Sequence, residues 1–206
     1  MKRFLQKLFG ADPAPEKAAV VVVSGLPRSG TSMMMKMLEA GGLPMVVDNI
    51  RTADEDNPRG YYELERVKQM DKGDTAWVAG ARGQVVKVIS ALLEHLPPDE
   101  SYRVLFMLRN MDEILASQRK MLEHRGEATD KLPDAEMAQL FAKHLDKVRT
   151  WLDAQPNFTV LYVDYNRMLA DPQSFAGDIN RFLGGGLDED AMLAAVDPAL
   201  YRNRAR

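Results

Sequence analysis

The sequence contains no cysteine and only three histidines among its 206 residues. Without cysteine the chain can form no disulfide, no thiolate metal site and no cysteine nucleophile. The three histidines are scattered, so a zinc site is not expected either. The sequence therefore predicts a protein suited to a reducing, cytoplasmic compartment, with a functional site that holds no metal.

Long apolar runs and a strong excess of charge are also absent. No apolar run exceeds that of Ala18–Val23, which is far shorter than the ~18 residues of a membrane-spanning helix. The net charge is −3, so we expect no nucleic-acid partner, and an anionic ligand must be held by locally placed cations. The apolar content of 46% and the charged content of 28% are typical of a globular domain.

The length favours one domain over two. We expect residues 18–206 to form that domain and residues 1–17 to form a tail and linker. Residues 1–9 are basic and mildly amphipathic but have no apolar core of a secretory signal. Contact of residues 1–9 with a membrane surface is an alternative to a frayed terminus.

Apolar, β-branched runs alternate with amphipathic segments along the rest of the chain. We expect strands over 18–24, 84–90, 102–108 and 158–163. We expect helices over 31–41, 62–72, 111–124, 134–155, 172–183 and 188–195. This alternation predicts an α/β fold with a mostly parallel sheet covered by helices on both faces, and with its ligands at the carboxyl ends of the strands.

The end of the first expected strand has the features of a phosphate site. Gly25 and Gly30 bound a loop between a buried strand and a helix start, where backbone N–H groups and the helix dipole attract an anion. The loop lacks the lysine that a nucleotide-triphosphate loop carries after its second glycine, because Thr31 stands there. The cation lies inside the loop, as Arg28.

The loop resembles that of the sulfotransferases that use 3′-phosphoadenosine 5′-phosphosulfate (PAPS), which reads Pro-[Lys/Arg]-Ser-Gly-Thr-[Thr/Ser] and matches Pro27–Ser32. A second family motif is an arginine at a strand end and a serine eight residues later, here Arg109 and Ser117. The resemblance implies a three-layer P-loop fold, with PAPS as cofactor and 3′-phosphoadenosine 5′-phosphate (PAP) as product. It implies that Arg109 and Ser117 hold the 3′-phosphate and that the 5′-phosphosulfate lies among Arg28, Ser29, Gly30, Thr31 and Ser32.

The second motif is also physically reasonable without the resemblance. Asn110 can cap the following helix, and Glu113 would complete a capping box. Arg109 then leaves the strand while Ser117 lies two turns into the helix, so both reach one phosphate. Arginine is permanently charged and forked for oxygen binding. An arginine that merely pairs with Asp112 is the alternative.

A third resemblance covers the last strand and the residues after it. Sulfotransferases commonly read Tyr-Glu-x-Leu-x-x-Asp-Pro there, followed by Phe-Leu-Gly. Tyr165 takes the tyrosine position, Asp171 and Pro172 close the motif, and Asn166 replaces the usual glutamate. The resemblance implies that Tyr165 lies near the adenine of the cofactor.

The second expected strand carries a candidate for a sulfonate-binding lysine. The cytosolic branch of the family ends this strand in Lys-x-His, and here Lys87 is followed at the histidine position by Ile89. The resemblance implies that Lys87 binds the sulfonate, whereas the base must come from elsewhere. His95 is near a strand end, and His144 flanks an apolar helix stripe, which indicates a structural role.

A carboxylate is the better candidate for the general base. The turn Asn57–Gly60 is followed by two tyrosines, which can hold Glu63 in a fixed direction. The segment resembles Asn-Pro-x-Gly-aromatic-aromatic-Glu of bacterial sulfotransferase-like proteins. We therefore expect Glu63 to be the base, with Glu55, Asp56 and His95 as alternatives.

These residues and resemblances predict a transferase that moves a sulfuryl group from PAPS to an acceptor hydroxyl or amine. Glu63 takes the acceptor proton, and Arg28 and Lys87 neutralise charge on the sulfonate and the bridging oxygen. Two alternatives stay open. One is a P-loop kinase or NTPase with Asp164 as a magnesium ligand, and the other is a catalytically silent nucleotide-binding protein. Composition specifies neither the acceptor nor an oligomeric state.

Overall fold

The structure is a computed structural model that describes residues 18–48, 50, 60–127 and 132–197. The expected tail, 1–17, and the alternative bases Glu55 and Asp56 lie outside the described residues. With η marking a 3₁₀ helix, the elements in chain order are β1 (Val20–Gly25), α2 (Thr31–Ala40), η1 (Glu65–Lys72), η2 (Val78–Ala81), β2 (Val85–Lys87), η3 (Ser90–His95), β3 (Tyr102–Leu108), α3 (Met111–His124), α4 (Asp134–Asp153), β4 (Phe158–Asp164), α5 (Tyr165–Ala170), α6 (Pro172–Leu183) and α7 (Glu189–Ala195).

The four strands form one sheet in the order β2-β1-β3-β4, and every pairing is parallel. The register pairs Val23 with Lys87 and Gly25 with Met107, so the carboxyl ends of the strands gather at one edge. β1 is buried along its whole length, as expected of a central parallel strand with both faces covered. The predicted α/β class is confirmed.

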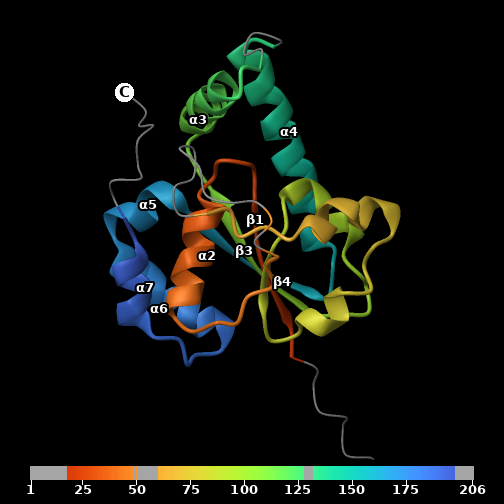
Figure 1. Cartoon of the computed structure of the whole chain (residues 1–206), viewed down its shortest axis with the longest axis vertical. Coiled ribbons are helices and arrows are strands. Elements are labelled where there is room, and N and C mark those ends of the chain that lie inside the picture. The colour runs from red at the N-terminus through yellow and green to blue at the C-terminus, as the bar shows by residue number, and fades with distance from the viewer. Residues whose placement is uncertain (1–17, 49, 51–59, 128–131, 198–206) are drawn as a thin grey trace, which may run out of the picture.

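Alternate residues of the strands build two cores, one on each face of the sheet. Val21 and Val23 pack with α2, α6 and α7 on one face, whereas Val20 and Val22 pack with η1, η3 and α4 on the other. Figure 1 shows the resulting three layers, with α2, α5, α6 and α7 to the left of the sheet in that view. In the described part of the chain, no helix has both the length and the apolarity needed to cross a membrane.

Several boundaries differ from the sequence predictions. The bounds of α3 and α6 are as predicted, but β2 covers only 85–87 because the chain turns into η3 at Ser90. The helix expected over 62–72 is a 3₁₀ helix that covers Glu65–Lys72. It begins only at Glu65 because Tyr62 has a φ of +52° and Leu64 is extended. The elements η2, η3 and α5 were not predicted. They have four to six residues, too few to show a helical apolar period.

Candidate active site

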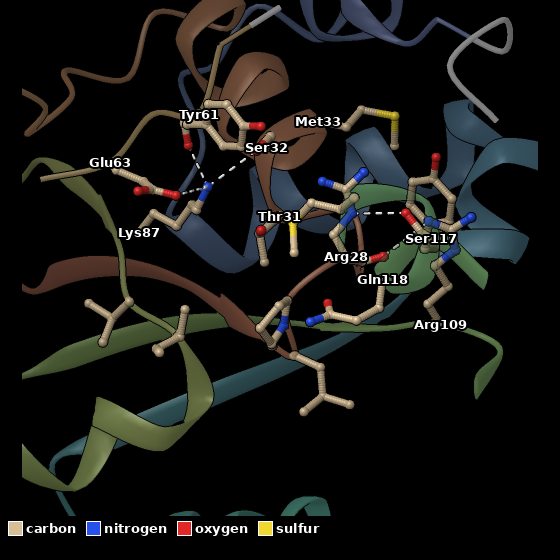
Figure 2. A pocket seen from close by; sticks show the side chains of 18 of the residues that line it. Arg28, Thr31, Ser32, Met33, Tyr61, Glu63, Lys87, Arg109, Ser117 and Gln118 are labelled. Carbon is tan, nitrogen blue, oxygen red and sulfur yellow. Dashed lines mark hydrogen bonds and ion pairs between the residues drawn. The ribbon is translucent and has the colours of Figure 1, made fainter. Parts of the chain in front are cut away.

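A pocket of about 660 Å³ lies at the carboxyl edge of the sheet. Its walls come from the β1–α2 loop, the segment after β2, the start of η1 and the inner face of α3. The pocket brings together nearly all of the predicted site residues: Arg28, Gly30, Thr31, Ser32, Glu63, Lys87, Arg109, Ser117 and Tyr165. The charged side chains form two groups in it, one around Lys87 and one around Arg28 and Arg109 (Figure 2).

The β1–α2 loop has the shape of an anion cradle. Gly30 is the N-cap of α2 with a φ of +99°, and it carries no side chain that could bond the first N–H groups of the helix. A Cβ on Gly30 would lie 2.3 Å from Cδ2 of Tyr165. Only glycine therefore fits between the helix start and this ring.

Ser29 is the one predicted site residue that does not line the pocket. It is 1% exposed, and both its hydroxyl and its backbone N–H donate to the carbonyl oxygen of Leu26, at 2.7 and 3.2 Å. These bonds close the loop on itself. The structure thus places Ser29 where it holds the shape of the loop.

The Arg28 group contains both predicted phosphate-binding elements. Arg28 Nε donates to Ser117 Oγ at 2.8 Å, which joins the loop to α3. Arg109 Nη1 donates to the backbone oxygen of Arg28 at 3.0 Å. Arg28 itself has a φ of +70°, a strained conformation for a residue with a side chain. Two guanidinium groups and a serine hydroxyl are therefore held at one side of the pocket.

In addition to its bond to the backbone of Arg28, Arg109 contacts a carboxylate and an aromatic ring. Its Nε donates to Glu113 Oε2 at 3.0 Å, and this ion pair is almost buried, with side chains 8% and 2% exposed. Its guanidinium carbon lies 4.6 Å from the centre of the Tyr165 ring, within the range of a cation–π contact. The carboxylate that pairs with Arg109 is thus that of Glu113 and not that of Asp112, which was the alternative from the sequence.

The capping box predicted at the start of α3 is wrong in one part. Asn110 Oδ1 does accept from the N–H groups of Asp112 and Glu113. The N–H of Asn110, however, donates to Asn166 Oδ1 at 3.2 Å, and Asn166 Nδ2 donates to Glu113 Oε2 at 3.0 Å. Glu113 is turned toward Arg109, so Asn166, which replaces the glutamate of the family pattern, completes the cap from α5.

The second group is centred on Lys87, whose side chain is 9% exposed. Lys87 Nζ donates to Ser32 Oγ at 3.2 Å and to the backbone oxygen of Tyr61. Glu63 Oε1 lies 3.9 Å from the same ammonium. Figure 2 shows Glu63, Tyr61 and Ser32 around Lys87. A carboxylate and a cation therefore meet beside the start of α2.

The segment that carries Glu63 is held by hydrogen bonds to the partly exposed Asp48. The N–H of Asp48 donates to Glu63 O at 3.2 Å, and Asp48 Oδ2 accepts from Glu65 N at 2.6 Å. The hydrogen bonds from the N–H groups of Glu65 and Ile50 lower the pKa of Asp48 below 3.8. Lys68 Nζ, 3.5 Å from Glu63 Oε2, adds a second cation beside the carboxylate.

His95 and His144 lie away from this chemistry, whereas His124 lines the large pocket at the end of α3. His144 Nε2 and Ser90 Oγ are 2.8 Å apart in a small separate pocket, and burial lowers the pKa of His144. His95 ends η3 and does not line the large pocket. The structural interpretation of His144 agrees with this packing.

Several residues that line the pocket were not identified from the sequence, and Gln118 and Lys68 are two of them. Gln118 follows Ser117, and its Oε1 is buried with no hydrogen-bond partner in the described part of the chain. Lys68 lies five residues after Glu63, at the end of the pocket that Glu63 lines. Neighbouring positions to predicted site residues were the only signal for either, because neither side chain belongs to a motif.

Comparison with known proteins finds similarity to sulfotransferases. The family model described as sulfotransferase domain matches residues 19–203, and no curated protein matches. Among solved structures, the chain is similar to the sulfotransferase domain from the curacin biosynthetic pathway, with 14% identity, a TM-score of 0.52, and coverage of 87% of this chain and 78% of that one.

Two further structures have similar scores. The sulfotransferase domain of the Synechococcus olefin synthase has 16% identity and a TM-score of 0.50, with coverage of 92% of this chain and 82% of that one. A sulfotransferase from Mycobacterium tuberculosis has 17% identity and a TM-score of 0.54, with coverage of 90% and 73%. At these identities the likeness shows a shared fold.

Proposed function

The chain belongs to the sulfotransferase domain family, and from this we propose that it transfers a sulfuryl group from PAPS to the hydroxyl or amine of an acceptor. The proposal is carried by one observation. The Pro27–Ser32 loop and the pair Arg109 and Ser117, which are far apart in the sequence, line one pocket and are joined by the Arg28–Ser117 hydrogen bond.

The residues present suit a ligand with two phosphates. We assign the 5′-phosphosulfate to the open N-terminus of α2, with the N–H groups near Gly30 and the hydroxyls of Thr31 and Ser32 as donors. We assign the 3′-phosphate to Arg109 and Ser117, since the ion pair with Glu113 already holds the guanidinium in place. Tyr165 supports this end of the pocket, and Ser29 keeps the loop closed.

The Lys87 group supplies what in-line transfer requires on the acceptor side. PAPS provides an activated sulfonate and PAP as leaving group. Glu63 accepts the proton of the attacking hydroxyl, while Lys87 and Arg28 neutralise negative charge on the sulfonate and the bridging oxygen. Lys87 bonds Ser32 of the phosphate loop and lies 3.9 Å from Glu63, so one cation connects the donor side with the base.

The kinase alternative finds less support. Asp164 Oδ1 accepts from the N–H of Arg167 at 2.9 Å and so caps α5, which gives this carboxylate a structural use. Thr31 occupies the position of the nucleotide-triphosphate lysine. The chemistry that we propose uses cationic side chains where a kinase uses magnesium.

Two broader features belong to the same proposal. We assign the protein to the cytoplasm, supported by its lack of cysteine. We assign it to a bacterial branch of the family, supported by the segment from Asn57 to Glu63.

The function is tested by incubating the protein with PAPS, labelled in its sulfonate, and a panel of phenols, alcohols, amines and sugars. Label transfer to an acceptor together with release of PAP is the expected result. Calorimetric titrations with PAP in the presence of a chelator, and with ATP plus magnesium, run in parallel. Binding of ATP plus magnesium but not of PAP would favour the kinase alternative. Binding of PAP without transfer to any acceptor would favour the silent nucleotide-binding protein.

A further inference from the structure

We infer that the acceptor is an alcohol whose hydroxyl is carried on a hydrocarbon body, aromatic or aliphatic, and not on a sugar. The inference rests on the proposed function, because it places the acceptor beside Glu63 and Lys87. It is carried by five side chains that line the same pocket and that we call the aliphatic wall: Leu64, Val67, Val88, Ile89 and Leu92.

The aliphatic wall is contiguous with the reacting groups along the chain. Leu64 follows Glu63 directly, and Val88 and Ile89 follow Lys87 where the chain leaves β2. η1 and η3, which bring Val67 and Leu92, pack against each other. An acceptor that presents its hydroxyl to Glu63 therefore lies against these residues.

The wall is backed by the core, so its shape is fixed. Val67 and Val88 are buried members of the core on this face of the sheet, and Leu64 and Leu92 pack against that core. Ile89 differs from the others, since 41% of it is exposed. A large aliphatic side chain left exposed next to a reacting lysine offers a contact surface for an apolar ligand.

The chemistry of the wall decides between the classes of acceptor. None of its five side chains carries a polar atom, whereas a sugar carries several hydroxyls. Each hydroxyl buried there without a partner would weaken binding by about 5- to 150-fold. A hydrocarbon body needs no hydrogen-bond partners along the wall, and its single hydroxyl meets the polar groups of Glu63 and Lys87, with Lys68 beside them.

The transfer step balances for such an acceptor. The acceptor oxygen forms the new oxygen–sulfur bond as the bond between sulfur and the bridging oxygen of PAPS breaks. The acceptor proton goes to Glu63, and PAP leaves with the electron pair of the broken bond. An alcohol on a hydrocarbon body supplies the nucleophilic oxygen and the proton and needs no further group.

The test has a transfer arm and a binding arm. In the first, sulfation rates are compared for phenol, 4-methylphenol, 4-ethylphenol, 4-propylphenol and octanol against glucose and glucosamine. Each methylene that reaches the wall is expected to raise kcat/KM about fourfold. In the second, fluorescence reports binding of 2-naphthol to the protein saturated with PAP.

Two variants make the binding arm specific. Ile89→Ser removes the exposed member of the wall and is expected to weaken 2-naphthol binding about tenfold without changing the affinity for PAP. Leu140→Ser, at a leucine of α4 that is 51% exposed and lies outside the pocket, is the matched control and should leave 2-naphthol binding at the wild-type level.

The outcomes separate this inference from the proposed function. Faster sulfation of glucose or glucosamine than of the alkylphenols would overturn the inference and leave the sulfotransferase proposal intact. Binding of 2-naphthol that Ile89→Ser weakens, with no transfer to any acceptor, would support the apolar site and contradict the proposed reaction. Equal binding by wild type, Ile89→Ser and Leu140→Ser would overturn the inference whatever the transfer arm gives.

Discussion

Replacement of Arg109 tests whether this residue reads the 3′-phosphate. Arg109→Ala should weaken PAP binding far more than binding of adenosine 5′-phosphate, which lacks that phosphate. Arg109 Nε and Nη1 already bond Glu113 and the backbone of Arg28, so we count one charge-assisted hydrogen bond to the phosphate. Such a bond contributes about 1.5–3 kcal/mol, which corresponds to about 10- to 150-fold in the dissociation constant of PAP.

The structure also predicts a side effect that the experiment must remove. Glu113 is 2% exposed, and leaving a buried carboxylate without its arginine costs about 3–5 kcal/mol of folding stability. The double variant Arg109→Ala/Glu113→Gln removes this unpaired charge. It should regain most of the lost stability in urea unfolding and keep the full defect in PAP binding.

The binding assay is isothermal titration calorimetry with both ligands. Arg119→Ala is the matched control, because Arg119 lies on α3, the helix that follows Arg109, but forms an exposed ion pair with Asp134, and such pairs contribute little. It should bind both ligands as the wild type does. If Arg109→Ala and the double variant weaken PAP and adenosine 5′-phosphate by the same factor, Arg109 has only a structural role and the assignment of the 3′-phosphate is refuted.

Three further predictions concern the base, the loop and the segment that holds the base. Glu63→Gln should lower kcat by about 10²–10⁴-fold with little change in PAP affinity. A nitrophenol acceptor should partly restore the turnover, because it loses its proton more easily. Turnover at the wild-type rate would mean that another group, such as Glu55, Asp56 or His95, is the base. Gly30→Ala should destabilise the protein more than Gly42→Ala in urea unfolding, because both glycines have a positive φ but only Gly30 meets the Tyr165 ring; equal losses would contradict the close packing. The lowered pKa of Asp48 gives stability that is present above pH ~3.8 and is lost as the pH falls through that lowered pKa. The wild type should therefore exceed Asp48→Asn in unfolding free energy at pH 6 and lose this advantage at strongly acidic pH, and a difference independent of pH would exclude the linkage.

The parts of the fold that could be predicted from the sequence are those with a strong local signal. β1 is a continuous run of valines, and α3 and α6 have amphipathic periodic patterns. α6 also has Asp171 as a cap and Pro172 in its first turn. The helix expected over 62–72 failed because its start depends on the left-handed conformation of Tyr62. No local sequence pattern predicts a left-handed conformation for a tyrosine.

The sequence predicts which residues form the site better than it predicts which of them contact one another. The loop and the pair Arg109 and Ser117 belong to motifs with fixed spacing, so their residues were available from the sequence. The contacts between Arg28 and Ser117, and between Asn166 and Glu113, join positions 89 and 53 residues apart. Such contacts depend on which strands are neighbours in the sheet, and no local sequence pattern determines the order of the strands.

The ring of Tyr165 has a mechanical consequence. One face of this side chain carries the guanidinium of Arg109, and its edge is packed so closely on Gly30 that a methyl group would not fit between them. The two proposed phosphate subsites therefore rest on a single rigid spacer that enters from the end of β4. This ring sets the distance between the two proposed subsites, so we expect the pocket to select a ligand by the separation of its two phosphates as well as by their charge.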